Sequence, residues 1–311
     1  MLSALEVLLA DETAGDPISG LKWTHKSLRK IQQALATEYS VSLPTISRLL
    51  QGCDYSLRVN HKRVAGKQSP DRDAQFRYIV RWRQAYLRRH WPVISVDAKK
   101  SELIGNFKQA GTEWRQQRRE VNMYDFLSLA TGKAIPYGIY DIGHNQGYVL
   151  VGTSHDTAEF AVAAIRAWWV KLGQWLYPRE KHVLIQADGG GSNGSRGKLW
   201  KVSLQRLADE FDLIITVNHY PTGASKWNLV EHRMFNLISG NWAGHPLDSY
   251  ATILNFIRTT TSTTGFSCQA DVDTTVYETG ITVSEEELAQ VRIRSHRRFP
   301  NSNYTIYPHP K

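Results

Sequence analysis

Three acidic residues stand out because their neighbours are apolar. Asp97 ends the run VISVD, and Asp188 ends the run HVLIQAD. Both runs have the length and composition of buried strands, and open α/β sheets bind ligands at the carboxyl ends of such strands. Glu231 lies in a predicted helix at 226–239, and helical spacing puts it inside an apolar stripe. The stripe comprises Trp227, Val230, Met234 and Ile238. An ionised carboxylate on a buried face needs partners or a cation.

Together these carboxylates predict a site for hard divalent cations, because Mg²⁺ and Mn²⁺ prefer oxygen ligands. Two such ions can stabilise the attacking and leaving oxygens of a phosphodiester displacement. Asn228, at the border of the apolar stripe, is expected to support the site. Taken singly, Asp97 could be a turn residue, Asp188 a helix cap and Glu231 a surface residue of a misphased helix. The combination of all three favours the metal site.

The stretch QADGGGSNGSR around Asp188 allows two explanations. Glycine, serine and asparagine are typical of a simple turn. Alternatively, Gly189 and Gly190 keep space open for metal ions and an approaching phosphate. The stretch lacks the spacing of a nucleotide-binding P-loop.

Other polar residues are weaker candidates. His219 and His232 could assist proton transfer or contact phosphate, although a lone histidine is more often structural. Asp156 is a rival third carboxylate, but a capping role is favoured, since either Asp156 or Thr157 is expected to cap the helix that follows.

The elements around these residues predict a mixed α/β sheet, because strands come first as hairpins and then alternate with helices. A hairpin is expected between NMYDFLSLA and AIPYGIYDI, joined by the turn TGK. Further strands are expected at YVLVG, HVLIQAD and DLIITVN, with helices between and after them.

The first third of the chain has a different character. Residues 1–91 hold 15 Lys and Arg against 8 Asp and Glu, of 38 and 29 in the whole chain. This excess predicts a module that binds a polyanion. Apolar spacing predicts one helix over 21–39 and a second over 44–52, which together form a helix-turn-helix.

These features predict three parts: a helix-turn-helix domain at 1–68, a basic connector helix at 69–91 and a catalytic domain at 92–311. Residues near the start of the second helix would meet base edges, and basic residues elsewhere would contact DNA phosphates. The expected DNA-binding residues are Thr45, Ser47, Arg48, Lys62, Arg63, Arg89, Lys99 and Lys100.

Two distant cysteines exclude a disulfide framework or a zinc finger. The N-terminus lacks the features of a signal peptide, and no apolar run has membrane-spanning length. We therefore expect a cytoplasmic protein, associated with the nucleoid when bound to DNA, and no membrane partner.

Several long motifs resemble one known family. VISVDAKKSELIGNFKQAGTEWR, SHDTAEFAVAAIRAWW, QADGGGSNGSR and HYPTGASKWNLVEHRMF are similar to DDE insertion-sequence transposases of the ISAzo type, the Rhodopirellula transposase family. The resemblance implies a ribonuclease-H-like core with Asp97, Asp188 and Glu231 as the DDE triad. It also implies two Mg²⁺ or Mn²⁺ ions, double-stranded DNA as element end and target, and a homo-oligomer assembled on DNA.

One departure from the family leaves an alternative. Members usually begin well upstream of the segment GDPISGLKWT, whereas this chain starts close to it. The alternative is a truncated, catalytically silent remnant that only binds DNA. A different ribonuclease-H-like nuclease is a further possibility, against which the long motif matches argue.

Overall fold

We analysed a computed structural model, which describes residues 2–10, 14–15, 22–23, 27–53, 55, 71–221, 223–224 and 227–311. The chain divides into two compact units, Met1–Val64 and Ala65–Lys311. Each unit has its own core. Within the described residues, no helix is both long enough and apolar enough to cross a membrane.

The first unit contains three helices and a two-stranded ladder. The helices are α1 (Leu2–Ala10), α2 (Leu28–Leu35) and α3 (Leu43–Gly52), and the strands are β1 (Ala14–Gly15) and β2 (Lys22–Trp23). One buried cluster joins the helices, comprising Leu5, Leu9, Ile31, Leu35 and Ile46. Helix α1 was not predicted, yet it supplies two of these five side chains.

Serine side chains set where α2 and α3 begin. Ser27 accepts a hydrogen bond from the Lys30 backbone, and Ser42 accepts one from the Thr45 backbone. Each bond satisfies a donor that the first helical turn leaves without an intrahelical partner. The predicted helix over 21–39 is therefore too long, since 22–23 form a strand and the helix starts after Ser27.

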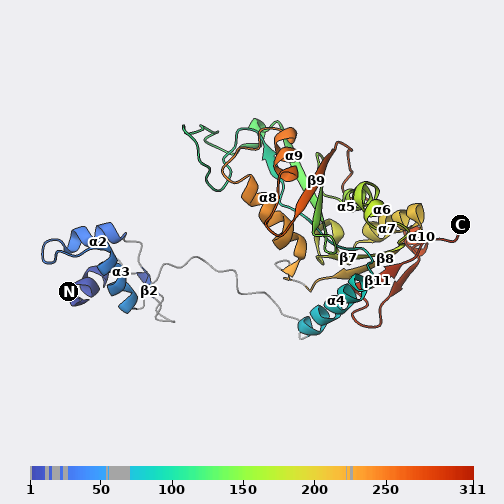
Figure 1. Ribbon diagram of the computed structural model, residues 1–311, viewed down its shortest axis with the longest axis horizontal. Coiled ribbons are helices and arrows are strands. Elements are labelled where there is room, and N and C mark those ends of the chain that lie inside the picture. The colour runs from blue at the N-terminus through green and yellow to red at the C-terminus, as the bar shows by residue number, and fades with distance from the viewer. Residues whose placement is uncertain are drawn as a thin grey trace. The chain divides into compact units, whose positions relative to one another are not determined.

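The second unit is built on a nine-stranded mixed sheet (Figure 1). Its order is β10-β11-β8-β7-β3-β5-β6-β9, with β4 paired to β5. The strands are β3 (Val93–Ala98), β4 (Glu102–Ile104), β5 (Gly132–Asp141), β6 (Gln146–Gly152), β7 (His182–Ala187), β8 (Ile214–His219), β9 (Ser267–Asp273), β10 (Ile293–Ser295) and β11 (Asn303–Ile306).

Pairing directions confirm the expected ribonuclease-H-like arrangement. Strands β3, β5 and β6 form an antiparallel meander, and β7 and β8 then add in parallel beside β3. Helices separate β6 from β7 and β7 from β8, as a parallel connection requires. This order places the ends of β3 and β7 side by side.

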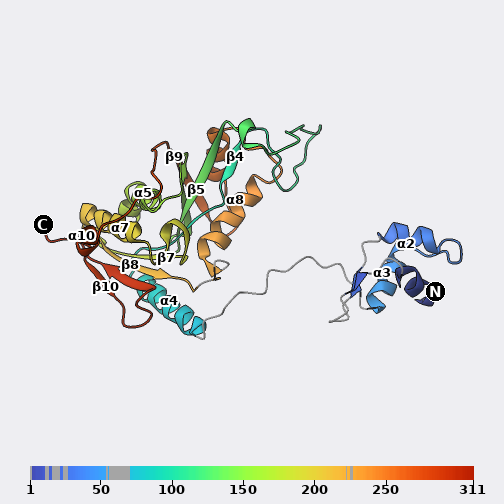
Figure 2. The same ribbon diagram turned by 180° about the vertical axis from the view of Figure 1, so that it is seen from behind.

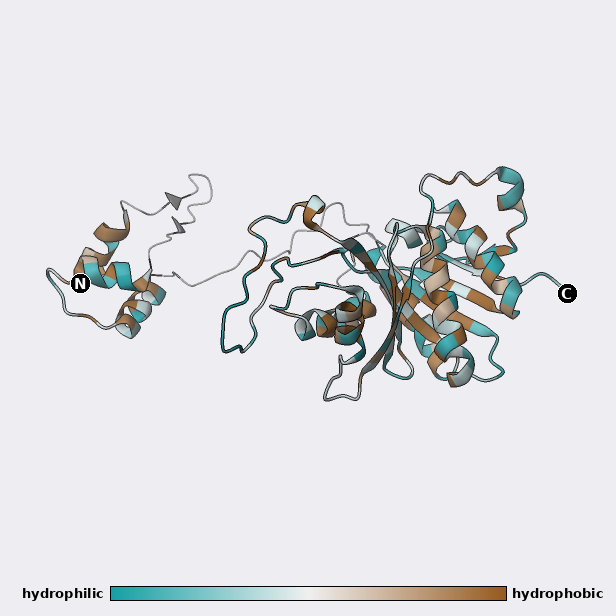
Figure 3. Ribbon diagram, turned by 90° about the horizontal axis from the view of Figure 1, so that it is seen from above, coloured by the Kyte–Doolittle hydropathy of each residue, from teal (hydrophilic) through white to brown (hydrophobic). Residues whose placement is uncertain are grey.

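Helices cover both faces of the sheet (Figures 1 and 2). One face carries α5 (Ala158–Trp168), its π-helical extension η2 (Trp169–Gly173), α6 (Gln174–Leu176), α7 (Lys198–Phe211) and α10 (Glu285–Ala289). The other carries α4 (Arg72–Leu87), the π-helical turn η5 (Glu231–Phe235), α8 (Asn236–Asn241) and α9 (Tyr250–Arg258). Hydrophobic residues run along the strands between these layers (Figure 3).

Helix α4 packs directly on the sheet as part of the second unit. Its Tyr86 is buried with Val93 of β3 and Leu184 of β7. Its Tyr86 hydroxyl also donates to Thr216 of β8 at 2.9 Å. The helix predicted as a connector therefore contributes to the core of the second unit.

The predicted hairpin between NMYDFLSLA and AIPYGIYDI is wrong. The first segment is a loop that contains only the 3₁₀ turn η1 (Leu127–Leu129), and β5 pairs instead with β3, β4 and β6. The apolar side chains of the loop misled the prediction, because they are exposed; Met123 keeps 85% of its accessible surface.

Candidate active site

Strand alternation and register bring Asp97 and Asp188 together. In β3, Ile94 and Val96 face the α5–α7 layer, so Ser95 and Asp97 face the opposite layer. Parallel pairing matches Val96 of β3 with Ala187 of β7. The next residues of the two strands are the two aspartates. They therefore share one edge and one face of the sheet.

An asparagine amide bridges the two carboxylates. Asn228 Nδ2 lies 3.3 Å from Asp97 Oδ2 and 3.2 Å from Asp188 Oδ1, and it also reaches the Val96 carbonyl at 3.2 Å. Ser95 Oγ donates to Asn228 Oδ1 at 2.5 Å and accepts from the Val230 backbone at 3.1 Å. Because Asn228 and Ser95 are fully buried, this network fixes both aspartates relative to the following helix.

Glu231 opens the π-helical turn η5, three residues after Asn228. Val230, Met234 and Ile238 are buried as predicted, but Trp227 is 46% exposed and precedes the helix. The buried stripe therefore starts at Val230 and continues through the π turn. Glu231 is half-buried and lies close enough to Asp188 for their charges to interact.

The electrostatics reflect the convergence of the three carboxylates. Burial, followed by repulsion from Asp188 and Glu231, raises the pKa of Asp97 from 3.8 to about 7. Burial also raises the pKa of Asp188 and of Glu231, and for Glu231 the charge of Asp188 adds to it. Three like charges in one place are costly unless a cation compensates them.

Metal geometry is not preformed. Among the described residues, no group of three or more His, Cys, Asp or Glu side chains is arranged to hold an ion as it stands. The donor chemistry nevertheless fits a hard cation, since the three carboxyl groups keep raised pKa values despite the groups that oppose the shift. The Asn228 amide supplies positive hydrogen-bond donors to two of them.

His219 supports Asp188 from behind. Its Nδ1 lies 2.9 Å from the Asp188 carbonyl, so this nitrogen carries the proton and donates. Its Nε2 can then accept from the Tyr304 hydroxyl at 3.2 Å, and that oxygen accepts from Trp200 at 2.8 Å. Burial lowers the pKa of His219 to about 4. His219 is fully buried and both of its ring nitrogens are hydrogen-bonded within the protein, so the structure does not present it to a phosphate as expected.

Asp156 lies outside the carboxylate group. Thr157, not Asp156, caps α5, because its side chain accepts from the Phe160 backbone. Burial raises the pKa of Asp156, but the like charges acting on Asp97 come from Asp188 and Glu231. Of the two residues expected to cap this helix, Asp156 or Thr157, the structure therefore has Thr157.

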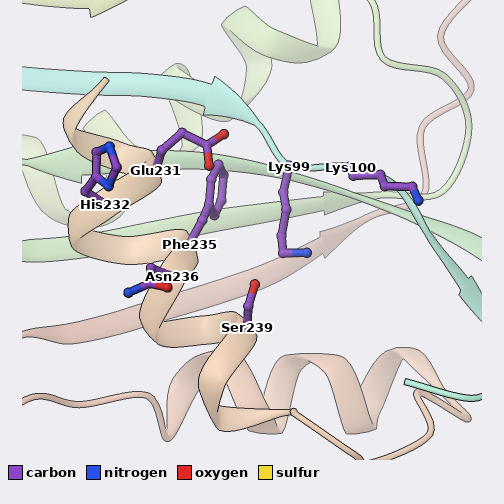
Figure 4. A pocket seen from close by; sticks show the side chains of 7 residues that line it. All are labelled: Lys99, Lys100, Glu231, His232, Phe235, Asn236 and Ser239. Carbon is purple, nitrogen blue, oxygen red and sulfur yellow. The ribbon is translucent and has the colours of Figure 1, made fainter. Parts of the chain in front are cut away.

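A pocket of about 550 Å³ opens beside Glu231 (Figure 4). This lysine pocket is lined by Lys99, Lys100, Glu231, His232, Phe235, Asn236 and Ser239. Lys99 Nζ donates a hydrogen bond to Glu102 Oε1 at 2.7 Å and lies 4.7 Å from the centre of the Trp242 ring. These two contacts fix the position of the Lys99 side chain. The structure thus brings Lys99, Lys100 and His232 to the same pocket as Glu231.

The glycines after Asp188 border open space. A Cβ atom at Gly190 would meet nothing within 4 Å, and one at Gly189 would make only an ordinary contact with the Tyr220 carbonyl. Packing therefore does not require glycine at either position.

The remaining predicted DNA-binding residues lie elsewhere. On α3, Arg48 is exposed and Thr45 and Ser47 are half-buried, while Lys62 and Arg63 fall outside the described residues. Arg89 is exposed beyond the end of α4, with its guanidinium 5.3 Å from the Trp91 ring centre. Because Trp91 precedes β3, Arg89 lies at the sheet edge opposite the carboxylates.

Sequence reasoning missed Ser95 and Tyr304. Ser95 had a detectable signal, since a polar residue inside VISVD shares the strand face of Asp97 two positions later. Tyr304 had none, because its link to His219 depends on the pairing of β11 with β8.

Comparison with known proteins identifies the family. Similar solved structures include a pre-cleavage Mos1 transpososome (14% identity, 82% of this chain, 69% of that chain, TM-score 0.46) and the mariner Mos1 paired-end complex with Mg (13%, 82%, 69%, 0.45). None of the curated proteins matches in sequence. The Rhodopirellula transposase DDE domain family matches residues 4–308 of the 311. Because that match covers nearly the whole chain, the protein belongs to the Rhodopirellula transposase DDE domain family.

Proposed function

We propose that this protein is a metal-dependent DNA transposase that cuts at the ends of its element and joins the freed 3′ hydroxyl to target DNA. The observation that carries the proposal is the pairing of Asp97 and Asp188 on the Asn228 amide, with the charge of Glu231 acting on Asp97. Family membership supplies the reaction class.

Asp97, Asp188 and Glu231 would hold two Mg²⁺ or Mn²⁺ ions. When bound, such ions stabilise charge on the phosphoryl oxygens and lower the pKa of a water molecule. The mariner Mos1 complexes include one with Mn and one with Mg. The protein's own part is to orient the carboxylates, which Asn228 does from the front and His219 does through the Asp188 backbone.

The DNA contacts are proposed at two places. Lys99 and Lys100 in the lysine pocket would neutralise phosphates next to the reacting one. The three-helix unit would recognise element ends through the exposed face of α3, with Arg48 as its charged residue. Double-stranded DNA is thus the partner, and we expect a homo-oligomer to assemble on it.

The test is Mn²⁺-supported nicking of labelled DNA that carries the terminal repeats of the element. The parent protein should nick the repeat end. The nicking rate of Asp188→Asn should be at least about 1000-fold lower, because the substitution removes a charged metal ligand but preserves the shape of the side chain. Both proteins should bind the DNA and melt at similar temperatures. Binding without nicking by the parent would favour a protein that only occupies DNA.

A further inference from the structure

A second cavity, of about 590 Å³, borders the loop that follows Asp188 and shares no lining residue with the lysine pocket. We call it the glycine groove. It is lined by Arg72 and Gln75 of α4, by Gly189, Gly191, Gly194, Ser195, Arg196 and Gly197, and by Tyr220, Pro221, Asn301 and Ser302. Since Gly189 follows Asp188 directly, the groove leads to the candidate active site.

The glycine wall of the groove presents backbone. Gly194 and Gly197 are needed for packing, because a Cβ atom would lie 3.2 Å and 3.1 Å from neighbouring carbonyl oxygens. Gly189, which also lines the groove, has no such constraint. No described residue accepts a hydrogen bond from its backbone N–H group. Its small size and available donor suit a ligand that approaches closely and carries negative charge.

Two arginines from separate elements supply positive charge to the groove. Among the described residues, neither Arg72 nor Arg196 pairs with a carboxylate, and no acidic side chain lines the groove. Arg72 is held in place, because it donates to the Gly223 carbonyl at 3.3 Å and lies 5.2 Å from the Trp227 ring centre. Arg196 is exposed.

The remaining polar lining completes the chemistry. Ser195, Asn301 and Ser302 offer neutral donors of the kind that proteins use on phosphate and sugar oxygens. An uncompensated arginine pair fits phosphate oxygens better than any neutral ligand, because the guanidinium matches their geometry. The lining lacks the carboxylates that a cation would need.

We propose that the glycine groove binds the sugar–phosphate backbone of one DNA strand, immediately beside the phosphate on which the carboxylates act. This inference rests on the proposed function for the identity of the polyanion. The reacting phosphate would then have the lysine pocket next to Glu231 and the glycine groove next to Asp188. Because the groove offers phosphate contacts, its binding is independent of sequence.

The experiment measures the affinity of the full chain for duplex DNA over a salt series. Arg72→Ala and Arg196→Ala should each weaken binding to every duplex about 3- to 20-fold and reduce the slope of log affinity against log salt by about 1. The matched controls are Arg166→Ala and Arg206→Ala, whose arginines pair with Glu210 and Glu159 on the opposite face of the sheet. These controls should bind like the parent.

A modified substrate locates the contact. Methylphosphonate replacing single phosphates beside the cleavage point should weaken binding by the parent at one position but have no further effect on Arg196→Ala. The proposal would be overturned if both groove variants kept the parent's slope of log affinity against log salt. It would also be overturned if both control variants lost as much DNA affinity as the groove variants. If the parent binds with the expected slopes but never nicks, the groove stands and the catalytic proposal fails. If the parent nicks and the groove variants match it, only the groove fails.

Discussion

The carboxylate site and helix α3 are positioned by different forces. At the site, buried polar side chains hold Asp97 and Asp188 through hydrogen bonds from Asn228 and His219. In the first unit, a small apolar cluster and two serine caps place the backbone of α3, and Arg48 is left exposed. Catalysis at the carboxylate site should therefore require exact atomic positions. DNA binding by α3 should instead depend on the charge and length of its exposed side chains.

This difference predicts unequal consequences of substitution. A buried polar network has few alternative partners, so removing one group leaves others unsatisfied. Removing an exposed side chain, by contrast, removes its own contact and leaves no other group unsatisfied. We expect large effects on chemistry at the site and small, salt-dependent effects on binding at α3.

After Asp188→Asn, the largest effect that leaves the fold intact should come from Gly190→Val. A Cβ atom there would meet nothing within 4 Å, and the backbone has φ −130°, which valine adopts. The protein should fold and melt as the parent does, but nicking should fall at least about 100-fold, since displacing a reacting group by about 1 Å can cost that much. Raising Mn²⁺ should not restore it, because the obstacle is steric. Normal nicking would mean that the glycines serve only as a turn.

Asn228 tests whether the network matters for chemistry beyond stability. Asn228→Ala should lower nicking about 10- to 100-fold, the usual effect of removing a group that orients metal ligands. Ser95→Ala, which removes the serine that holds Asn228, should have a smaller effect in the same direction. The measurement is nicking across a Mn²⁺ titration, where a positioning role shifts the Mn²⁺ requirement upward. A loss that is uniform at every Mn²⁺ concentration and matched by lower melting would contradict that role.

The sequence predicts those residues of the site that follow a local pattern, and it misses those that depend on contacts between distant residues. Asp97 and Asp188 were identifiable because each ends an apolar strand, and that pattern is local. Glu231 was identified by helical period, yet the stripe was partly wrong because Trp227 precedes the helix and is exposed. The network behind Asp188 could not be predicted, since it joins β8 to β11 across 85 residues.

A local apolar pattern also gave a wrong strand prediction where the apolar side chains are not buried. The segment NMYDFLSLA has the composition of a strand, but its larger side chains are exposed and no sheet edge accepts it. Strand pairing decides this outcome, and pairing partners are distant in sequence. The edge strands β9 and β10 escaped prediction for the same reason.

Charge repulsion at the site should appear as a pH-dependent cost in stability. The pKa of Asp97 is raised to about 7, so the folded state binds this proton more tightly than the unfolded state does. The free energy of unfolding should therefore fall as pH rises from about 4 to about 7. Asp97→Asn removes that charge and should stabilise the metal-free protein above pH 7 by about 1–3 kcal/mol.

The measurement is the melting temperature with EDTA at pH 5 and pH 8. The advantage of Asp97→Asn should be absent or small at pH 5 and reach a few degrees at pH 8. Added Mg²⁺ should raise the melting temperature of the parent more than that of the variant. A variant that is less stable than the parent at pH 8 would show that the lost hydrogen bond from Asn228 outweighs the relief of repulsion.

The smallest effects are expected at the DNA-reading surfaces, where Arg48 and Arg89 separate two kinds of contact. Arg48→Ala should weaken binding to element ends by about 1–3 kcal/mol, the value of a bidentate base contact, and barely change binding to unrelated DNA. Arg89→Ala should weaken binding to all DNA alike and lower the salt slope by about 1. Thr45→Ala is the matched variant on α3, because its hydroxyl is 2.9 Å from Ser42 in the cap and its loss should affect melting more than selectivity. Competition binding with repeat and scrambled duplexes measures all three. If Arg48→Ala loses the same affinity for both duplexes, α3 contacts phosphates rather than bases. The contrast between a precise catalytic site and a helix that reads sequence would then no longer hold.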